Sequence, residues 1–192
     1  MQNVDATTSA TLGQTGASRA PGPGDILAVV FAVQSLTDQQ DALRPDAQLL
    51  LDDLDRAGVR AAVIATAPGG RDLTRRSGLE LRASIVIDEH YAKAFRLTDE
   101  RRHGQVLQHA ARRLGVPLGA TVTVECDPDR IQQARESGAC WVAVLARGSS
   151  AEHRLPLRTR GADALLSTLW PVPNGTWWQA LGIGMAEAPN PG

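Results

Sequence analysis

The sequence has almost no lysine and no excess of charge of either sign. Lys93 is the only lysine, so arginine supplies nearly all of the 20 basic residues, and 21 acidic residues bring the formal net charge to −1. A chain without net positive charge lacks the field that draws proteins to nucleic acid through phosphate contacts. We therefore expect no nucleic-acid partner.

Cysteine is scarce, and long hydrophobic runs are missing. Cys126 and Cys140 make neither a disulfide framework nor a zinc-ligand spacing, which is typical of a reduced compartment. The longest apolar runs, Ile26–Val33 and Ala139–Ala146, are far shorter than the ~20 residues of a membrane-spanning helix. The first 24 residues have no basic start and no apolar stretch of the kind that a secretory signal needs. These absences predict a cytoplasmic protein without membrane contact, with a disordered leader over residues 1–24.

Short apolar runs alternate with amphipathic segments along the rest of the chain. Strands are expected at Ile26–Val33, Arg60–Thr66, Ala83–Ile87, Thr121–Glu125 and Trp141–Leu145. Helices are expected at Pro45–Ala57, Gly70–Ser77, Arg101–Leu114, Pro128–Ser137 and Ala162–Leu169. Apolar strands that alternate with helices ending at glycine are typical of a parallel sheet covered on both faces. The pattern predicts an α/β fold over residues 25–170, a Rossmann-like three-layer αβα sandwich with a mainly parallel five-stranded sheet.

Five segments occur in the order and with the gaps of a known family. They are VVFAVQSLTD (Val29–Asp38), LLLDDLDRAGVRAAVIAT (ending at Thr66), HAARRLGVP (His109–Pro117), VTVECDPDRIQQARESGACWVAVL (Val122–Leu145) and GADALLSTL (Gly161–Leu169). In these segments the chain resembles the haloacid dehalogenase-like (HAD) phosphatases and mutases, in particular the branch that contains β-phosphoglucomutase. The resemblance covers residues 25–170 and implies a HAD-like core domain.

The resemblance also implies a catalytic motif from which this sequence departs. Members of the family attack a phosphoryl group with an aspartate at the end of the first strand, and an aspartate two residues later acts as general acid and base. The matching positions here are Ala32 and Gln34. Alanine cannot attack phosphorus, and a glutamine amide has no proton to exchange near neutral pH. We therefore expect no intact catalytic pair.

Parts of the family's phosphate site are retained. Thr66 matches the residue that holds phosphoryl oxygens, and Gly69 and Gly70 follow it with backbone amides that can cradle an anion at a helix start. Arg101 matches the position of the family's lysine and keeps its charge. The alternatives are that Thr66 only ends a strand and that Arg101 lies in a solvated helical turn.

The family's acidic metal motif is reduced to Glu125, Asp127 and Asp129, because Cys126 follows Glu125 where a second acid is expected. Hard cations need oxygen ligands, so the resemblance implies at most a weak metal site. We expect no cofactor, or Mg²⁺ if the chain is active. Cys126 is either a buried structural cysteine or a reactive loop thiol.

Histidine gives no further site. His90, His103 and His109 are scattered, and none is obviously paired with a carboxylate for nucleophile activation. We expect all three at the surface.

Two further features bear on partners. Where the mutase branch has a helical cap domain, only Gln39–Pro45 lie between the first motif and the next helix, so no cap is expected and the site is open to large substrates or a covering chain.

Aromatic residues make up only 4% of the chain, yet Trp170, Trp177 and Trp178 cluster near its end. Residues 171–192 are either a strap packed on the domain or an aromatic anchor for a protein partner.

Two functions remain open. The first is a HAD-like protein that has lost phosphatase or phosphomutase activity and acts as a binding, scaffold or regulatory module. The alternative is a Mg²⁺-dependent hydrolase that acts on a phosphate ester with a substitute nucleophile such as Asp38 or Asp127.

Overall fold

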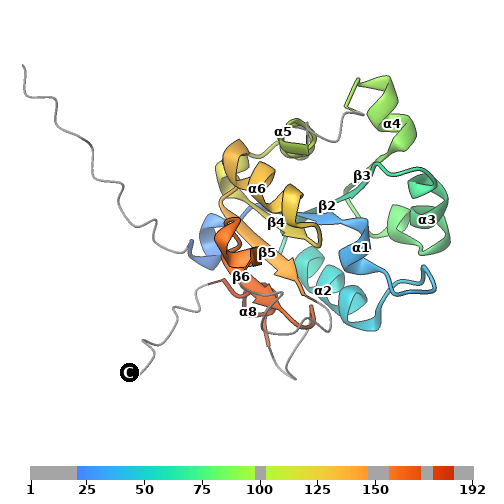
Figure 1. The fold of residues 1–192 in the computed structure, drawn as a ribbon. Helices are drawn as coiled ribbons and strands as arrows, with labels where there is room; N and C mark the ends of the chain where they lie inside the picture. The colour runs from blue at the N-terminus through green and yellow to red at the C-terminus, as the bar shows by residue number, and fades with distance from the viewer. Residues whose placement is uncertain (1–20, 98–102, 147–155, 170–174, 184–192) are drawn as a thin grey trace, which may run out of the picture.

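A parallel sheet of six strands forms the centre of the molecule (Figure 1). The structure is a computed structural model that describes residues 21–97, 103–146, 156–169 and 175–183. The strands are β1 (Ala28–Ala32), β2 (Arg60–Ala65), β3 (Ile85–Asp88), β4 (Thr121–Glu125), β5 (Trp141–Leu145) and β6 (Ala164–Leu166). The helices are α1 (Val33–Leu36), α2 (Pro45–Arg56), α3 (Gly70–Arg76), α4 (Glu89–Ala94), α5 (His103–Leu114), α6 (Pro128–Ser137) and α8 (Trp177–Ala180). Arg101 and the leader up to residue 20 lie outside the described residues.

The strand order, β3-β2-β1-β4-β5-β6, places β1 in the middle of the sheet. The chain runs outward from β1 through β2 to β3 and then returns to add β4 on the other side of β1, and all five pairings are parallel. The direction of the order therefore changes between β1 and β4. In open α/β sheets ligands bind at the carboxyl ends of the strands beside such a switch point.

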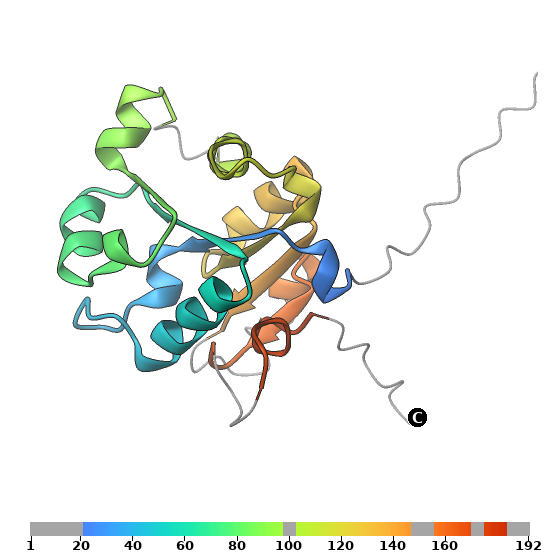
Figure 2. The same ribbon diagram turned by 180° about the vertical axis from the view of Figure 1, so that it is seen from behind.

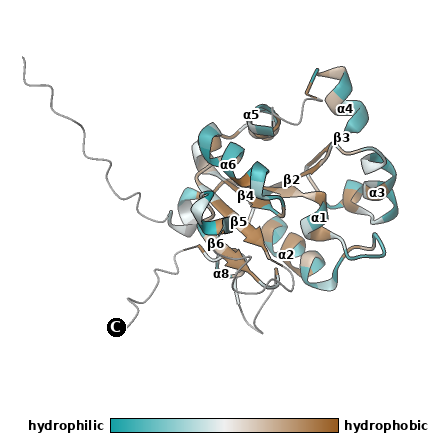
Figure 3. Ribbon diagram, in the orientation of Figure 1, coloured by the Kyte–Doolittle hydropathy of each residue, from teal (hydrophilic) through white to brown (hydrophobic). Residues whose placement is uncertain are grey.

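Helices cover both faces of the sheet, as Figures 1 and 2 show from opposite sides. α2 and α8 pack on one face, and α4, α5 and α6 pack on the other. Side chains of β1 alternate between the two cores, with Val29 and Phe31 on the α2 side and Ala28 and Val30 on the α5 side. The colouring in Figure 3 follows this division, because the strands are hydrophobic and the outer faces of the helices are hydrophilic. The three-layer αβα prediction is confirmed.

The predicted helix Ala162–Leu169 is wrong, because none of these residues is helical and the centre of the segment is the sixth strand. β6 pairs with β5 through Ala143↔Ala164, Val144↔Leu165 and Leu145↔Leu166. The carboxylate of Asp163 accepts a hydrogen bond from the Val142 amide (2.7 Å), which fixes the start of the strand at the sheet edge. Leu165 and Leu166 pack toward opposite cores, as strand residues do. The sheet therefore has six strands instead of five.

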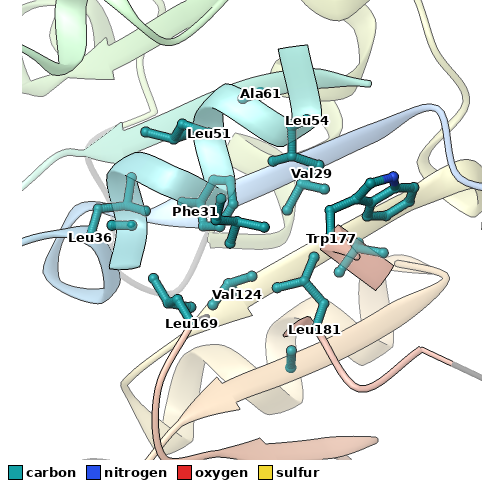
Figure 4. Close-up of a cluster of buried hydrophobic side chains, with 14 of the residues drawn as sticks. Val29, Phe31, Leu36, Leu51, Leu54, Ala61, Val124, Leu169, Trp177 and Leu181 are labelled. Atoms are coloured by element: carbon teal, nitrogen blue, oxygen red, sulfur yellow. The ribbon is translucent and has the colours of Figure 1, made fainter. Parts of the chain in front are cut away.

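The C-terminal segment of the described chain packs against the core on the α2 side (Figure 4). Trp177 is buried among Leu54, Val29 and Leu181, and the indole N–H of Trp141 donates to the carbonyl of Leu181 (3.2 Å). Trp178 is half-buried, whereas Trp170 lies outside the described residues. Residues 175–183 thus form a strap on the domain, and the predicted protein partner for this region stays a prediction.

Within the described residues, no helix has both the length and the apolar character needed to cross a lipid bilayer.

Candidate functional site

Two adjoining pockets open at the carboxyl edge of the sheet. The larger has a volume of about 480 Å³ and the smaller about 220 Å³. The larger pocket is lined by Thr66, Ala67, Pro68, Gly69, Glu89, His90, Lys93, Leu97, His103, Val106 and Arg130. The smaller is lined by Ala32, Gln34, Glu125, Cys126, Asp127 and Arg130. The structure therefore brings the ends of β1, β2 and β4 together, as the sequence predicted.

β1 lies in the middle of the sheet, and its last residue at this edge is an alanine. Ala32 is buried, and α1 begins at the next residue, so the chain turns away directly and exposes Gln34. A short hairpin follows, closed by an antiparallel bridge between Thr37 and Leu43. Asp38 stabilises this hairpin, because its Oδ1 accepts hydrogen bonds from the amides of Gln40 (2.8 Å) and Ala42 (2.9 Å). Asp38 is therefore a turn residue in this structure.

The end of β2 carries the predicted phosphate residues on a tight turn. Thr66 and Gly69 line the larger pocket, and Gly69 has a positive φ of 82° that favours glycine. Gly70 is buried instead, and an added Cβ would lie 1.8 Å from the carbonyl oxygen of Ala65. Its amide donates to the carbonyl of Ala67 (3.0 Å). The two glycines therefore hold the turn close to β2, and an anion-binding role for their amides stays a prediction.

The end of β4 holds a buried pair that the sequence did not predict. Glu125 is fully buried, and its Oε1 lies 2.7 Å from Nε2 of His103 and accepts a hydrogen bond from the hydroxyl of Thr123 (2.9 Å). His103 is 4% exposed, so the prediction of a surface position is wrong for this residue. The signal was in the sequence: Val106, Leu107 and Ala110 follow at helical spacing and place His103 on the buried stripe of α5.

His90 and His109 lie nearer the surface than His103. His90 is exposed, and His109 is half-buried, with its Nε2 3.0 Å from the hydroxyl of Tyr91. Burial lowers the pKa of His109, and the charges of Arg112 and Arg113 lower it further. His109 does not line either pocket.

The three predicted metal residues do not converge. Asp127 caps α6 by accepting a hydrogen bond from the amide of Asp129 (2.9 Å), and Asp129 is exposed and ion-paired with Arg160. In the described parts of the chain, the one group of three ligand-type residues with converging atoms is Asp88, Glu89 and His90. Cys126 is half-buried and is not in a disulfide.

Both carboxylates of that group already accept hydrogen bonds from backbone amides. Asp88 caps α4 by accepting from the amide of Tyr91 (2.7 Å), and Glu89 accepts from the amide of Arg71 (2.7 Å). His90 is exposed beside them. These contacts link α4 to α3 and shape the rim of the larger pocket.

Positive charge reaches the pockets from two residues that the sequence analysis missed. Lys93, the only lysine, lies on α4, and Arg130 lies in the first turn of α6; both line the larger pocket. Lys93 lies outside the five family-like segments, and Arg130 lies inside one of them without matching a named site position; each reaches the pocket through the packing of its helix. Arg101, the predicted cation, lies outside the described residues.

Solved structures with a similar fold include a phosphatase, a dehalogenase and a mutase. The cobalt-bound deoxy-D-mannose-octulosonate 8-phosphate phosphatase of Haemophilus influenzae aligns with a TM-score of 0.54 at 16% identity, over 82% of this chain and 90% of its own. The fold is that of the HAD hydrolases. The β-phosphoglucomutase of Clostridium difficile also has this HAD fold (TM-score 0.53, 12% identity, 71% of this chain and 54% of the other).

A HAD-family hydrolase of Deinococcus radiodurans, solved with bound phosphate and sodium, aligns with a TM-score of 0.53 at 23% identity, over 66% of this chain and 55% of its own. The chain thus spans about half the length of this hydrolase and of the mutase. No protein-family model matches the sequence, and no curated protein matches it either. At these identities the comparisons establish the HAD fold.

Proposed function

We propose that this protein is a HAD-like binding module that has lost phosphoryl transfer and holds an anionic, phosphate-type ligand in its larger pocket. One observation carries the loss of activity. The side chain at the end of the central strand β1, beside the switch point of the sheet, is the methyl group of Ala32. A methyl group has no electron pair for phosphorus, so the covalent step has no attacking atom there.

The nearby carboxylates support the same conclusion because each has a structural partner. Asp38 holds the hairpin turn, Asp127 caps α6, and Glu125 is bound to His103 and Thr123. Nucleophilic attack needs the reacting atoms about 3–3.5 Å apart with aligned orbitals. A carboxylate that is fixed by backbone or side-chain donors does not move freely into that geometry.

The side chains that line the larger pocket support a binding function. The hydroxyl-bearing residue Thr66 lies with Lys93 and Arg130 around a pocket that also has apolar walls at Leu97 and Val106. Hydroxyl, ammonium and guanidinium groups are the donors that phosphate oxygens prefer. The hydrolase of Deinococcus radiodurans, which shares the fold, contains bound phosphate.

The pocket is open to solvent on the side where a cap would lie. Between β1 and α2 the chain forms only α1 and the short hairpin closed by Thr37 and Leu43. No segment there is long enough to cover the ligand and exclude water. This openness suits a binding module whose ligand is presented by, or shared with, another molecule.

The proposal is tested by restoring the missing acids. We expect the wild-type protein to show no hydrolysis of para-nitrophenyl phosphate above background with Mg²⁺, and the Ala32→Asp, Gln34→Asp double variant to gain measurable turnover. The single variants serve as controls for background. Clear wild-type turnover that Asp127→Asn abolishes would establish the alternative, a Mg²⁺-dependent hydrolase with a substitute acid.

A further inference from the structure

Arg130 stands between the two pockets and lines both of them. On one side lies the acidic pocket of Glu125 and Asp127, where the guanidinium Nε is 4.0 Å from Oδ2 of Asp127. On the other side lies the larger pocket with Thr66 and Lys93. The Arg130 side chain is only 23% exposed, so its charge is held at this boundary.

A divalent metal would have to occupy the same boundary, and the residues present do not fit one. Mg²⁺ requires near-octahedral oxygen ligands, most often carboxylates. The Oε1 atom of Glu125 is taken by His103 and Thr123, the Oδ1 atom of Asp127 accepts the amide of Asp129, and Ala32 offers no ligand atom.

One oxygen is left over on the acidic side. The Oε2 atom of Glu125 is buried and has no hydrogen-bond partner among the described residues. A single carboxylate oxygen does not make a magnesium site, and the Arg130 guanidinium in the same pocket repels a second cation.

We propose that Arg130 supplies the positive charge that a metal ion would supply here, so that this site binds phosphate-type anions without a metal. The inference rests on the proposed binding function. A guanidinium can donate two parallel hydrogen bonds to a phosphate while its remaining N–H groups face a carboxylate. Arg130 then lies between the ligand and Asp127 and screens their repulsion, and Lys93 contributes a second charge from α4.

This arrangement also selects the ligand class. A nucleotide that arrives as its magnesium complex brings a divalent cation next to a fixed guanidinium, which opposes binding. A free phosphate or a metal-free phosphate monoester has no such conflict. The ligand of this site is therefore an uncomplexed phosphate or monoester.

The experiment is a calorimetric titration of the full-length protein with inorganic phosphate, once in excess EDTA and once in millimolar Mg²⁺. We expect the two affinities to agree. Arg130→Gln should weaken binding by about tenfold or more, because a charge-assisted pair is lost, and Arg130→Lys should recover only part of it. Arg113→Gln, an exposed position on α5 outside both pockets, is the matched control and should bind as the wild type does.

The outcomes separate this inference from the proposed function. Phosphate binding that needs Mg²⁺, or that survives Arg130→Gln unchanged, overturns the role of Arg130 and leaves the binding module intact. No phosphate binding in either buffer overturns the proposed function and the inference together. Circular dichroism of each variant shows whether it is folded. If Arg130→Gln does not fold, the phosphate affinity of Arg130→Lys is compared with that of the wild type in its place.

Discussion

The ends of β1 and β4 are neighbours in the sheet, and they bring different side chains to the smaller pocket. At the end of β1 the polar side chain is absent, because Ala32 is a small apolar residue that packs without a partner. At the end of β4 an acid is retained, but His103 and Thr123 bind it inside the protein. Neighbouring strand ends therefore differ in kind: one brings no polar side-chain atom to the pocket, and the other brings a carboxylate that the protein itself binds.

The largest loss of stability should come from removing a hydrogen-bond partner of Glu125 at the end of β4. His103→Ala leaves the buried side chain of Glu125 with only Thr123. A buried polar group that loses a hydrogen-bond partner costs roughly 1–3 kcal/mol of unfolding free energy, and the cavity left by the imidazole adds to this loss. Urea denaturation measures the loss. His103→Gln, whose amide can still donate to Glu125, is the control and should lose clearly less. A His103→Ala variant as stable as the wild type would show that the pair does not hold β4.

A smaller effect is expected when the β1 side is made polar. Ala32→Asp adds a carboxylate to a pocket that already contains Glu125 and Asp127, and like charges in one site oppose each other. We expect a loss of about 2 kcal/mol in EDTA, measured by thermal or urea unfolding. Mg²⁺ should restore part of the stability of this variant and none of the wild type's. Ala32→Asn, which has the same shape as Ala32→Asp without the charge, should be equally stable in EDTA and in Mg²⁺.

The smallest effect concerns Asp127, which lies beside both strand ends. Because its side chain caps α6, Asp127→Ala should lose about 1 kcal/mol of unfolding free energy, and Asp127→Asn almost nothing, since asparagine caps equally well. The two variants together test whether the residue is structural in the wild-type protein. A large loss for Asp127→Asn would mean that its charge has a further role at the site.

Most of the fold was predictable because its signals are local. Buried strands such as Thr121–Glu125 read as unbroken apolar or β-branched runs, and α6 ends at Gly138, whose left-handed conformation closes the helix. β6 was missed because a strand of three residues has too few positions to show its period, and GADALLSTL reads equally well as a helix.

The site was predictable only where it depends on strand ends. Ala32, Gln34 and Thr66 follow their strands directly, so the parallel order alone brings them to one edge. Lys93 and Arg130 reach the pockets from helices whose placement depends on tertiary packing, and the family resemblance assigns a role to neither residue. The pairing of His103 with Glu125 joins residues that lie 22 positions apart, a contact that a single sequence does not encode by spacing.

The strap over residues 175–183 has a consequence for how the chain folds during synthesis. The cluster around Val29 on β1 is completed by Trp177 and Leu181, which are synthesised only after all six strands. β1 also pairs with β4, and the helices α1 to α5 and the strands β2 and β3 lie between them in the sequence. Contacts of this length are slow to form, and the apolar face of the sheet stays uncovered until they do. We therefore expect nascent chains that end before the strap to depend on chaperones, although all six strands have already been synthesised.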